Sequence, residues 1–260
     1  METVHVARTG GVVTVTLNRP ERKNALTTAM IEELRVTFDD VAHHPEDRVL
    51  VLTGAGDDFC SGADLSGPGR PSLEDPAAAL EGVRRVGELA RSLHGLGKPS
   101  IARVDGVAVG AGLGLAIGCD LVLAADRARF STIFARRALS PDCGTSWLLP
   151  RLVGAAKAKE LAYFADVVDA DTARSVGLVN RVVPHEELDT VVGEWALRLA
   201  EGPSLALSTT KSLLDSAWSS SLDDALEHEA QCQAQNLTGA DVKEAIAAFL
   251  EKRPAHYGPR

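Results

Sequence analysis

The feature of this sequence that most narrows its possible folds is an alternation of short apolar segments with helical patterns. Residues 49–53 read VLVLT and stop at Gly54, and residues 100–104 and 121–124 form two further segments of similar length. Between the last two, residues 112–117 begin a helical stretch. Parallel strands need long crossover connections, which are usually helices. We therefore predict an α/β fold with a parallel sheet.

The chain before this alternation is expected to form a hairpin and a helix. Residues 4–7 and 12–17 have strand character on either side of Gly10, where a turn is predicted. Thr27 or Thr28 then stands in a suitable place to cap a helix. The apolar positions of that helix keep helical spacing: Met30, Ile31, Leu34, Phe38 and Val41.

The C-terminal part of the chain has a different character. Strand patterns end near Pro184, and the remaining residues are predicted to be helical. We place a boundary near residue 200, between an α/β core of residues 1–200 and a helical region of residues 201–260. Because the helical region is too small to be stable alone, we expect it to pack on the core or on another subunit. The four predicted helices span residues 186–200, 203–216, 222–236 and 241–250.

Composition excludes some classes of function. The chain has 36 acidic and 27 basic residues, a net charge of −9, so a nucleic-acid partner is not expected. Its 4 cysteines have no metal-ligand spacing and are expected to be free thiols, with no metal site. The N-terminus lacks the apolar stretch of a signal peptide, and no run approaches the roughly 18 apolar residues of a membrane span. We predict a cytoplasmic protein without a membrane partner.

Residues 106–118, GVAVGAGLGLAIG, suggest a nucleotide-binding loop but do not fit one. The dinucleotide fingerprint needs a small residue at its sixth position, where this chain has Leu115 or Ile117. No Gly-Lys-Ser/Thr follows, so a P-loop is absent as well. The G-x-S-x-G and H-E-x-x-H signatures of hydrolases and zinc peptidases do not occur either.

Two glycine-containing segments are instead expected to work as a pair. Residues 58–65, DFCSGADL, follow the strand that ends at Gly54, and the second segment enters a helix near Gly112. Small residues let a backbone approach a ligand, and a helix start leaves its first N–H groups unpaired. Two such N–H groups that converge on one oxygen form an oxyanion hole, which stabilises negative charge on a carbonyl. Tight packing remains the alternative for each segment alone.

Several motifs, in order along essentially the whole chain, resemble the crotonase (enoyl-CoA hydratase/isomerase) superfamily. They are NRPERKNAL at residues 18–26, FCSGADL at 59–65, DGVAVGAGLGLAIGCD at 105–120, PDCGTSWLLPRLVG at 141–154, AxxxGLVNxVV at 173–183 and AFLEKRP at 248–254. The resemblance implies a ClpP-like spiral of ββα units with a C-terminal helical trimerisation region. It also implies an acyl-CoA thioester as substrate, a homotrimer or dimer of trimers, and no cofactor beyond the coenzyme A of the substrate.

The resemblance also implies roles for particular residues. The oxyanion donors are expected to be the backbone N–H groups of Ala63 and Ala111, the latter in place of the usual glycine. Phe249 and Lys252 match residues that often reach the CoA of a neighbouring subunit. The other positions that match CoA contacts are Arg22, Asn24, Ala25, Leu26, Ser61, Asp64 and Leu65. Surface charge is the alternative for Arg22 and Lys252.

The two glutamates that hydratases of this family use are missing. Gly114 stands at the first position, and Phe134 falls where the second is expected. One carboxylate remains in this part of the chain, Asp142 in SPDCGT, which matches the acid/base of double-bond isomerases and ring-epoxide isomerases in the family. From the residues alone Asp142 could equally cap a helix. Asp64 and Asp120 are weaker candidates.

The resulting hypothesis is an enoyl-CoA isomerase in which Asp142 is the single acid/base. An enoyl-CoA hydratase, or another lyase or hydrolase of the family, is the first alternative, and a non-catalytic acyl-CoA-binding protein is the second. Ile133, Phe134, Trp147 and the Gly- and Pro-rich loop of residues 66–76 are expected to line the acyl pocket, although core packing is the alternative for the three side chains.

Overall fold

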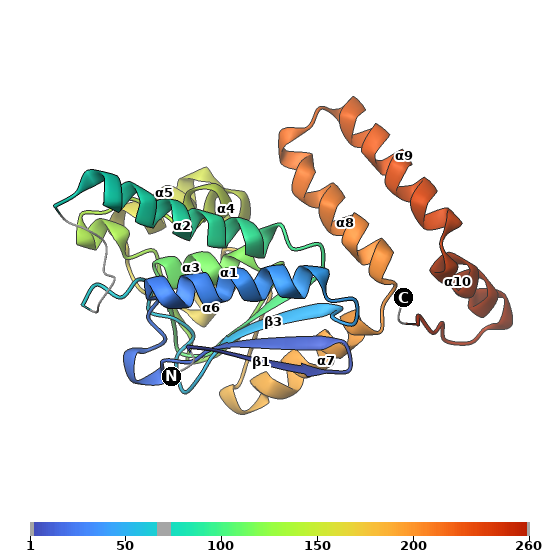
Figure 1. Cartoon of the computed structure of the whole chain (residues 1–260), viewed down its shortest axis with the longest axis horizontal. Helices are drawn as coiled ribbons and strands as arrows, with labels where there is room; N and C mark the ends of the chain where they lie inside the picture. The colour runs from blue at the N-terminus through green and yellow to red at the C-terminus, as the bar shows by residue number, and fades with distance from the viewer. Residues whose placement is uncertain (1–2, 67–73, 259–260) are drawn as a thin grey trace.

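The computed structural model describes residues 3–66 and 74–258 and is built around a six-stranded sheet (Figure 1). The strand order is β1-β2-β3-β4-β6-β9. β1 and β2 form the predicted hairpin and pair antiparallel, whereas every later pair is parallel. The strands are β1 (Val4–Thr9), β2 (Val12–Leu17), β3 (Val49–Gly54), β4 (Ser100–Val104), β6 (Leu121–Ala125) and β9 (Arg181–Val183).

A second sheet of three short strands has the order β5-β7-β8, with β5 (Val107–Val109), β7 (Arg129–Ser131) and β8 (Val168–Asp169). β5 and β7 are parallel, and β8 is antiparallel to β7. Because β4 and β5 are separated by only two residues, the chain passes directly from the large sheet to the small one. Such passages between the two sheets form the spiral that the family resemblance implies.

Three helices cover one face of the large sheet: α1 (Thr28–His43), α2 (Pro76–His94) and α3 (Ala111–Gly118). Thr27 caps α1 by accepting a hydrogen bond from the Met30 N–H, and the five apolar positions predicted for this helix are all buried. The sequence analysis did not predict α2. Its apolar positions Leu80, Val83, Val86, Leu89 and Leu93 do keep helical spacing, and Leu89 and Leu93 are buried.

The opposite face of the sheet is covered by α7 (Leu188–Ala200), whose buried Leu188, Val191 and Val192 pack against side chains of β3, β4 and β6. The rest of the core consists of short helices between β7 and α7. These are η2 (Phe134–Arg137), α4 (Thr145–Val153), α5 (Ala155–Phe164), α6 (Ala170–Ser175) and η3 (His185–Glu187), while η1 (Pro20–Arg22) lies between β2 and α1.

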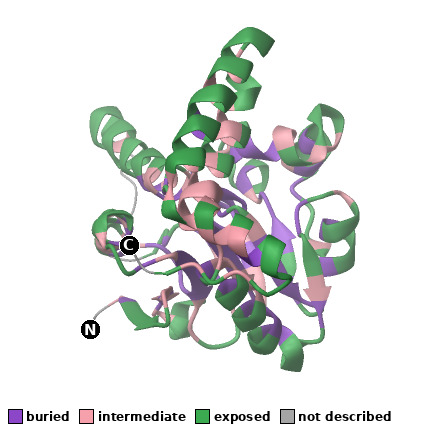
Figure 2. Cartoon of the chain, turned by 90° about the vertical axis from the view of Figure 1, so that its right-hand side faces the viewer, coloured by how far each residue is buried: buried purple, intermediate pink, exposed green. Residues whose placement is uncertain are grey.

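The chain after residue 200, which we call the helical tail, extends away from the sheet (Figure 1). It comprises α8 (Ser204–Ser216), η4 (Ala217–Ser219), α9 (Leu222–Thr238) and α10 (Ala240–Glu251). In α8, α9 and α10, only Cys232 and Ala248 are buried: α8 is mostly half-buried, α9 is mostly exposed, and Figure 2 shows the intermediate and exposed residues in pink and green. The large apolar side chains exposed on the helical tail include Leu214, Trp218 of η4, Leu222, Leu226, Leu237, Ile246, Phe249 and Leu250.

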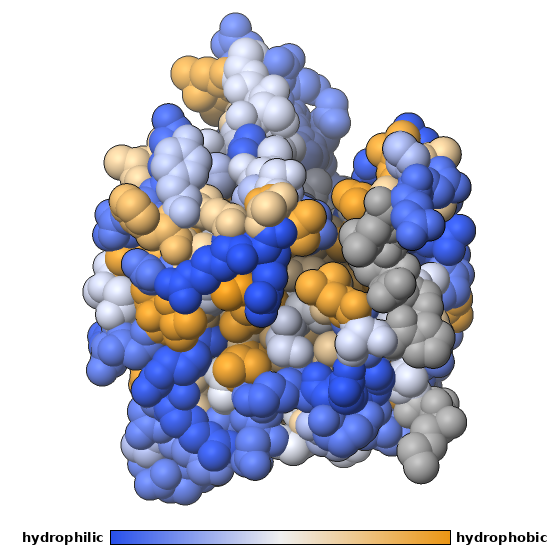
Figure 3. Space-filling model, turned by 90° about the vertical axis from the view of Figure 1, so that its left-hand side faces the viewer, coloured by the Kyte–Doolittle hydropathy of each residue, from blue (hydrophilic) through white to orange (hydrophobic). Residues whose placement is uncertain are grey.

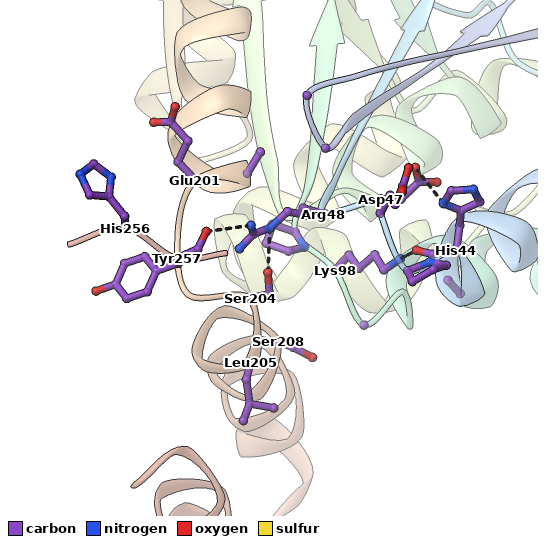
Figure 4. Close-up of a pocket in the computed structure, with 18 of the residues that line it drawn as sticks. His44, Asp47, Arg48, Lys98, Glu201, Ser204, Leu205, Ser208, His256 and Tyr257 are labelled. Carbon is purple, nitrogen blue, oxygen red and sulfur yellow. Dashed lines mark hydrogen bonds and ion pairs between the residues drawn. The ribbon is translucent and has the colours of Figure 1, made fainter. Parts of the chain in front are cut away.

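A cavity of about 950 Å³ lies where the tail meets the core (Figure 4). Arg48, at the start of β3, crosses this joint and donates to Ser204 Oγ at 2.9 Å, to the Gly202 carbonyl at 2.6 Å and to the Tyr257 carbonyl at 3.3 Å. Lys98 nearby donates to two carbonyls at the end of α1. The hydrogen bonds of Arg48 and Lys98 therefore join segments of the chain at this cavity.

Among the described residues, no helix is both long and apolar enough to span a membrane.

Candidate active site

The two glycine-containing segments singled out in the sequence lie side by side. The Cys60 N–H donates to the Val107 carbonyl at 2.9 Å, and the Val109 N–H donates to the Cys60 carbonyl at 3.0 Å. This parallel bridge holds the residues after β3 against β5. The end of β5 leads through Gly110 into α3, so residues 60–63 run beside the start of that helix.

Ala63 presents its N–H group away from its neighbouring segment. The Leu26 N–H donates to the Gly62 carbonyl, and the Asp64 N–H donates to the Leu26 carbonyl, both at 2.8 Å. In such a parallel bridge the N–H of the middle residue points to the opposite side of the strand. Within residues 3–66 and 74–258, the Ala63 N–H donates to no hydrogen bond, and Ala63 is exposed.

Ala111 is the first residue of α3, so its N–H has no partner within the helix. Gly110 makes this start possible, because its φ of 58° belongs to a backbone region that favours glycine. A Cβ atom at Gly112 would lie 2.3 Å from the Cys60 carbonyl oxygen, so only glycine allows the two segments to approach this closely. A Cβ atom at Gly62 would lie 3.5 Å from the Ala111 nitrogen. The Ala63 and Ala111 N–H groups therefore lie in adjacent segments at the positive end of a helix, a geometry suited to one anionic oxygen.

The loop that contains the predicted CoA contacts is fastened to this pair by Asn24 and Arg19. Asn24 is 0% exposed, and its side-chain amide donates to the Ala55 and Asp58 carbonyls at 2.9 and 2.7 Å. Asn24 therefore has no exposed surface, in side chain or backbone, for a direct contact with a ligand. Arg19, which the sequence analysis missed, donates to the Ala25 carbonyl. Its other partner is Asp64, 45 residues away, and local sequence spacing cannot reveal such a contact.

Asp64 serves this loop. Its carboxylate is 4% exposed, accepts from Arg19 at 2.9 Å and from the Ser66 N–H and hydroxyl, and lies 3.6 Å from Arg22. Hydrogen bonds from Ser66 and Arg19 hold the pKa of Asp64 well below its ordinary value. A permanently ionised carboxylate is a poor proton acceptor, so Asp64 is unsuited to be the acid/base.

Asp142 has the opposite environment. It lies in the turn before α4, partly buried, and its Oδ1 has no hydrogen-bond partner among the described residues. Burial raises the pKa of Asp142 to about 6. The alternative that Asp142 caps a helix is wrong, because α4 begins after Gly144 without a side-chain cap. A carboxylate with a pKa near neutrality and a free oxygen is suited to take up and return a proton.

The turn that carries Asp142 contacts α3 one helical turn after Ala111. A Cβ atom at Gly114 would lie 2.7 Å from both the Cβ and the carbonyl oxygen of Cys143. Asp142 is therefore adjacent, through Cys143, to the helix whose first N–H faces the Ala63 segment. Gly114 itself and the buried Phe134 bring no carboxylate to this place. Asp120, the other weak candidate, anchors β4 through Ser100 and pairs with Lys211 at 2.9 Å.

The residues predicted to line the acyl pocket have different surroundings. Ile133 lies against the start of α3, since its Cγ2 would be 3.2 Å from a Cβ atom at Gly110, and its φ of 51° is strained for a β-branched residue. Phe134 follows it and is 6% exposed. Trp147 instead stacks under Arg151, 3.8 Å from its guanidinium carbon, and contacts His94. In the predicted loop, residues 67–73 lie outside the described residues.

Apolar side chains border the site on its open side. Figure 3 views the end of the molecule opposite to the helical tail and shows apolar groups set among hydrophilic ones. Leu65, which follows Asp64, and Leu139, in the segment before Asp142, are 51% and 55% exposed. Such a surface is suited to an apolar acyl group.

Phe249 and Lys252 are far from the site of their own chain. Both belong to the end of α10, in the tail on the far side of the sheet from residues 54–66 (Figure 1). Phe249 is 81% exposed. Within the described residues, no group of three His, Cys, Asp or Glu side chains could hold a metal ion.

Comparison with known proteins matches this architecture. The sequence profile of the enoyl-CoA hydratase/isomerase family matches residues 7–260. The chain is 39% identical over 248 residues to 1,2-epoxyphenylacetyl-CoA isomerase of Escherichia coli (strain K12), covering 95% of each chain. It is 36% identical over 246 residues to crotonyl-CoA hydratase of Syntrophomonas wolfei, covering 93% of this chain and 92% of that one.

A solved structure agrees with the sequence comparison. The enoyl-CoA hydratase of Bacillus anthracis superposes with a TM-score of 0.94 at 31% identity, covering 100% of both chains. The fold, the paired glycine segments and these similarities lead to one conclusion: the chain belongs to the enoyl-CoA hydratase/isomerase family, the crotonase superfamily, and is an acyl-CoA enzyme of that family.

Proposed function

We propose that this protein is an enoyl-CoA double-bond isomerase with Asp142 as its single acid/base. The observation that carries the proposal is the environment of Asp142: a partly buried carboxylate with an unpartnered oxygen and a pKa raised to about 6. Hydration in this family uses two carboxylates on one water, and the motif resemblance assigns Gly114 and Phe134 to the positions of those two glutamates. One group that accepts and returns a proton is sufficient for isomerisation.

The reaction follows from the two parts of the site. The thioester oxygen accepts hydrogen bonds from the Ala63 and Ala111 N–H groups, and ionised Asp142 removes a proton from the carbon next to the carbonyl. The electron pair moves into the thioester, giving a dienolate whose oxygen is stabilised by the two N–H groups. Protonated Asp142 returns the proton two carbons further along the acyl chain. The double bond is thereby displaced by one position with no net gain or loss of atoms.

The loop of residues 18–26 and the segment of residues 61–65 are the proposed binding surface for CoA, with Arg22 and Ser61 at the exposed or half-exposed positions. No cofactor beyond this CoA is part of the proposal. We further infer that the tail joins subunits in a homotrimer or dimer of trimers. Its exposed apolar side chains and the distance of Phe249 and Lys252 from their own site support contact with the CoA of a neighbouring subunit.

Product analysis tests this function. The protein is mixed separately with a 3-enoyl-CoA and a 2-enoyl-CoA, and the products are followed by mass. Isomerisation leaves the mass unchanged, whereas hydration adds one water. A hydrated product, or isomerisation that persists in Asp142→Asn, would overturn the proposal. Binding of both esters without any turnover would instead favour a non-catalytic binding protein.

A further inference from the structure

The turn that carries Asp142 is unusually close to α3 at one residue, Gly114. A Cβ atom built there would lie 2.7 Å from Cys143 Cβ, 2.7 Å from the Cys143 carbonyl oxygen and 3.0 Å from Thr145 Oγ1. Real Cβ atoms essentially never come closer than 3.0 Å to other atoms. The close atoms are a backbone oxygen and a Cβ, which cannot move without moving the turn itself.

The turn has little freedom to adjust. Cys143 and Gly144 both have positive φ, 49° and 73°, and the Thr145 N–H donates to the Asp142 carbonyl at 2.9 Å. Cys143 is 2% exposed and Thr145 is 0% exposed, so both are enclosed by protein. On the other side of α3, Gly112 fits against Cys60, which keeps the helix from moving away. The turn is held against α3 in one position.

We infer that Gly114 is a positioning residue for Asp142: the absence of a side chain there lets Cys143 enter α3 and holds the Asp142 carboxylate at the reacting carbons. The inference rests on the proposed function and adds a specificity device to it. The space that a side chain at residue 114 would need is occupied here by Cys143. A side chain at residue 114 and this position of Asp142 exclude each other sterically, so the chain is committed to single-carboxylate chemistry by packing as well as by composition.

Gly114→Ala tests the inference, with Gly118→Ala as the matched control in the same helix. A Cβ atom at Gly118 would meet only Leu93 Cδ2, at 3.5 Å, an ordinary contact with a flexible side chain. Gly118 is the last residue of α3, so its variant controls for adding one methyl group to this helix where there is room for it. We expect Gly114→Ala to lower kcat at least tenfold with little change in KM, and Gly118→Ala to behave as the parent.

The pH profile separates positioning from general damage. When the turn is displaced, Asp142 becomes more hydrated, and the acidic limb of its kcat profile should move towards the ordinary pKa of aspartate, by about 1 unit. The double variant Gly114→Ala/Cys143→Gly removes one of the two closest contacts and accepts a positive φ, so it should recover part of the lost kcat and the original limb. This variant also covers the case in which Gly114→Ala alone folds poorly.

Other results would contradict either the positioning role of Gly114 or the proposed isomerase function. Equal losses in the Gly114 and Gly118 variants, or a Gly114→Ala enzyme with the parent's kcat and pH profile, would overturn the positioning role while Asp142→Asn stays inactive. An active Asp142→Asn enzyme would overturn the proposed function. In that case a crystal structure of Gly114→Ala still tests the packing, because an undisplaced Cys143 contradicts it.

Discussion

The core and the helical tail use their apolar residues in opposite ways. In the core, the apolar faces of α1 and α7 are buried against the two sides of the sheet, and the close packing extends to the glycines beside the Ala63 and Ala111 N–H groups. In the tail, α8 to α10 bury almost nothing and expose seven large apolar side chains. The difference fits the two proposals made above, that proton transfer uses the core of one chain and that the tail contacts a neighbouring subunit.

Asp142→Asn is the largest expected effect and tests whether the chemistry is confined to the core. General acid/base catalysis typically contributes 10² to 10⁴ in rate, so kcat should fall about 10³-fold. KM and the oligomeric state should not change, because the tail is untouched. Steady-state kinetics and light scattering measure both. Asp126→Asn, at an exposed carboxylate, is the control and should keep the parent's kcat.

Leu214→Asp tests whether the helical tail contacts a neighbouring subunit. Leu214 is 65% exposed and lines a groove between α8 and α9 with Leu226. If a neighbouring subunit buries this leucine, the charge should shift the assembly to monomers, with a loss of about 1.5–3 kcal/mol per buried side chain. Sedimentation velocity measures the shift. Val36→Asp, at a 57% exposed position on α1, should leave assembly intact. An assembly that withstands Leu214→Asp would place the subunit contacts elsewhere.

Arg48→Ala tests the joint between the two regions. Removing its bonds to Ser204, Gly202 and Tyr257 should destabilise the docking of the tail by about 1–3 kcal/mol, since Arg48 is only half-buried. Hydrogen exchange should quicken in α8 but not in α1 or α3. Arg35→Ala, which breaks an exposed ion pair with Glu32, is expected to change little. Faster exchange throughout the core would contradict a local role.

The smallest expected effect is a pH-dependent loss of folding stability caused by the Asp142 carboxylate. Because the pKa of Asp142 is about 6 in the folded protein, above its ordinary 3.8, protonation favours the folded state, and stability falls as pH rises from about 4 to 6. Asp142→Asn should therefore be more stable than the parent at pH 7.5, by about 1–3 kcal/mol, and equal to it near pH 4. Urea unfolding at both pH values measures this, and equal stability at pH 7.5 would contradict the raised pKa.

Local patterns were sufficient for most elements of this fold. The hairpin, the cap at Thr27, the buried face of α1, strands β3, β4 and β6, and the tail helices follow from periodicity, which depends on residues close in sequence. The motifs predicted the family, which the comparisons confirm, and identified Ala63, Ala111 and Asp142 as candidates. Helix α2 was overlooked although its apolar residues keep helical spacing, and the short strands β5, β7, β8 and β9 and the helices α5 and α6 were not predicted either.

Only the tertiary structure decided how the candidates are used. Asn24 and Asp64 match CoA contacts in sequence, but their side chains hold loops together, because their partners lie 31 to 45 residues away. The choice between cap and acid/base for Asp142 depended on where α4 begins. The contact of Gly114 with Cys143 joins residues 29 positions apart and has no signal in either segment. Sequence determines which groups are available, whereas burial and long-range contacts determine which of them are free to react.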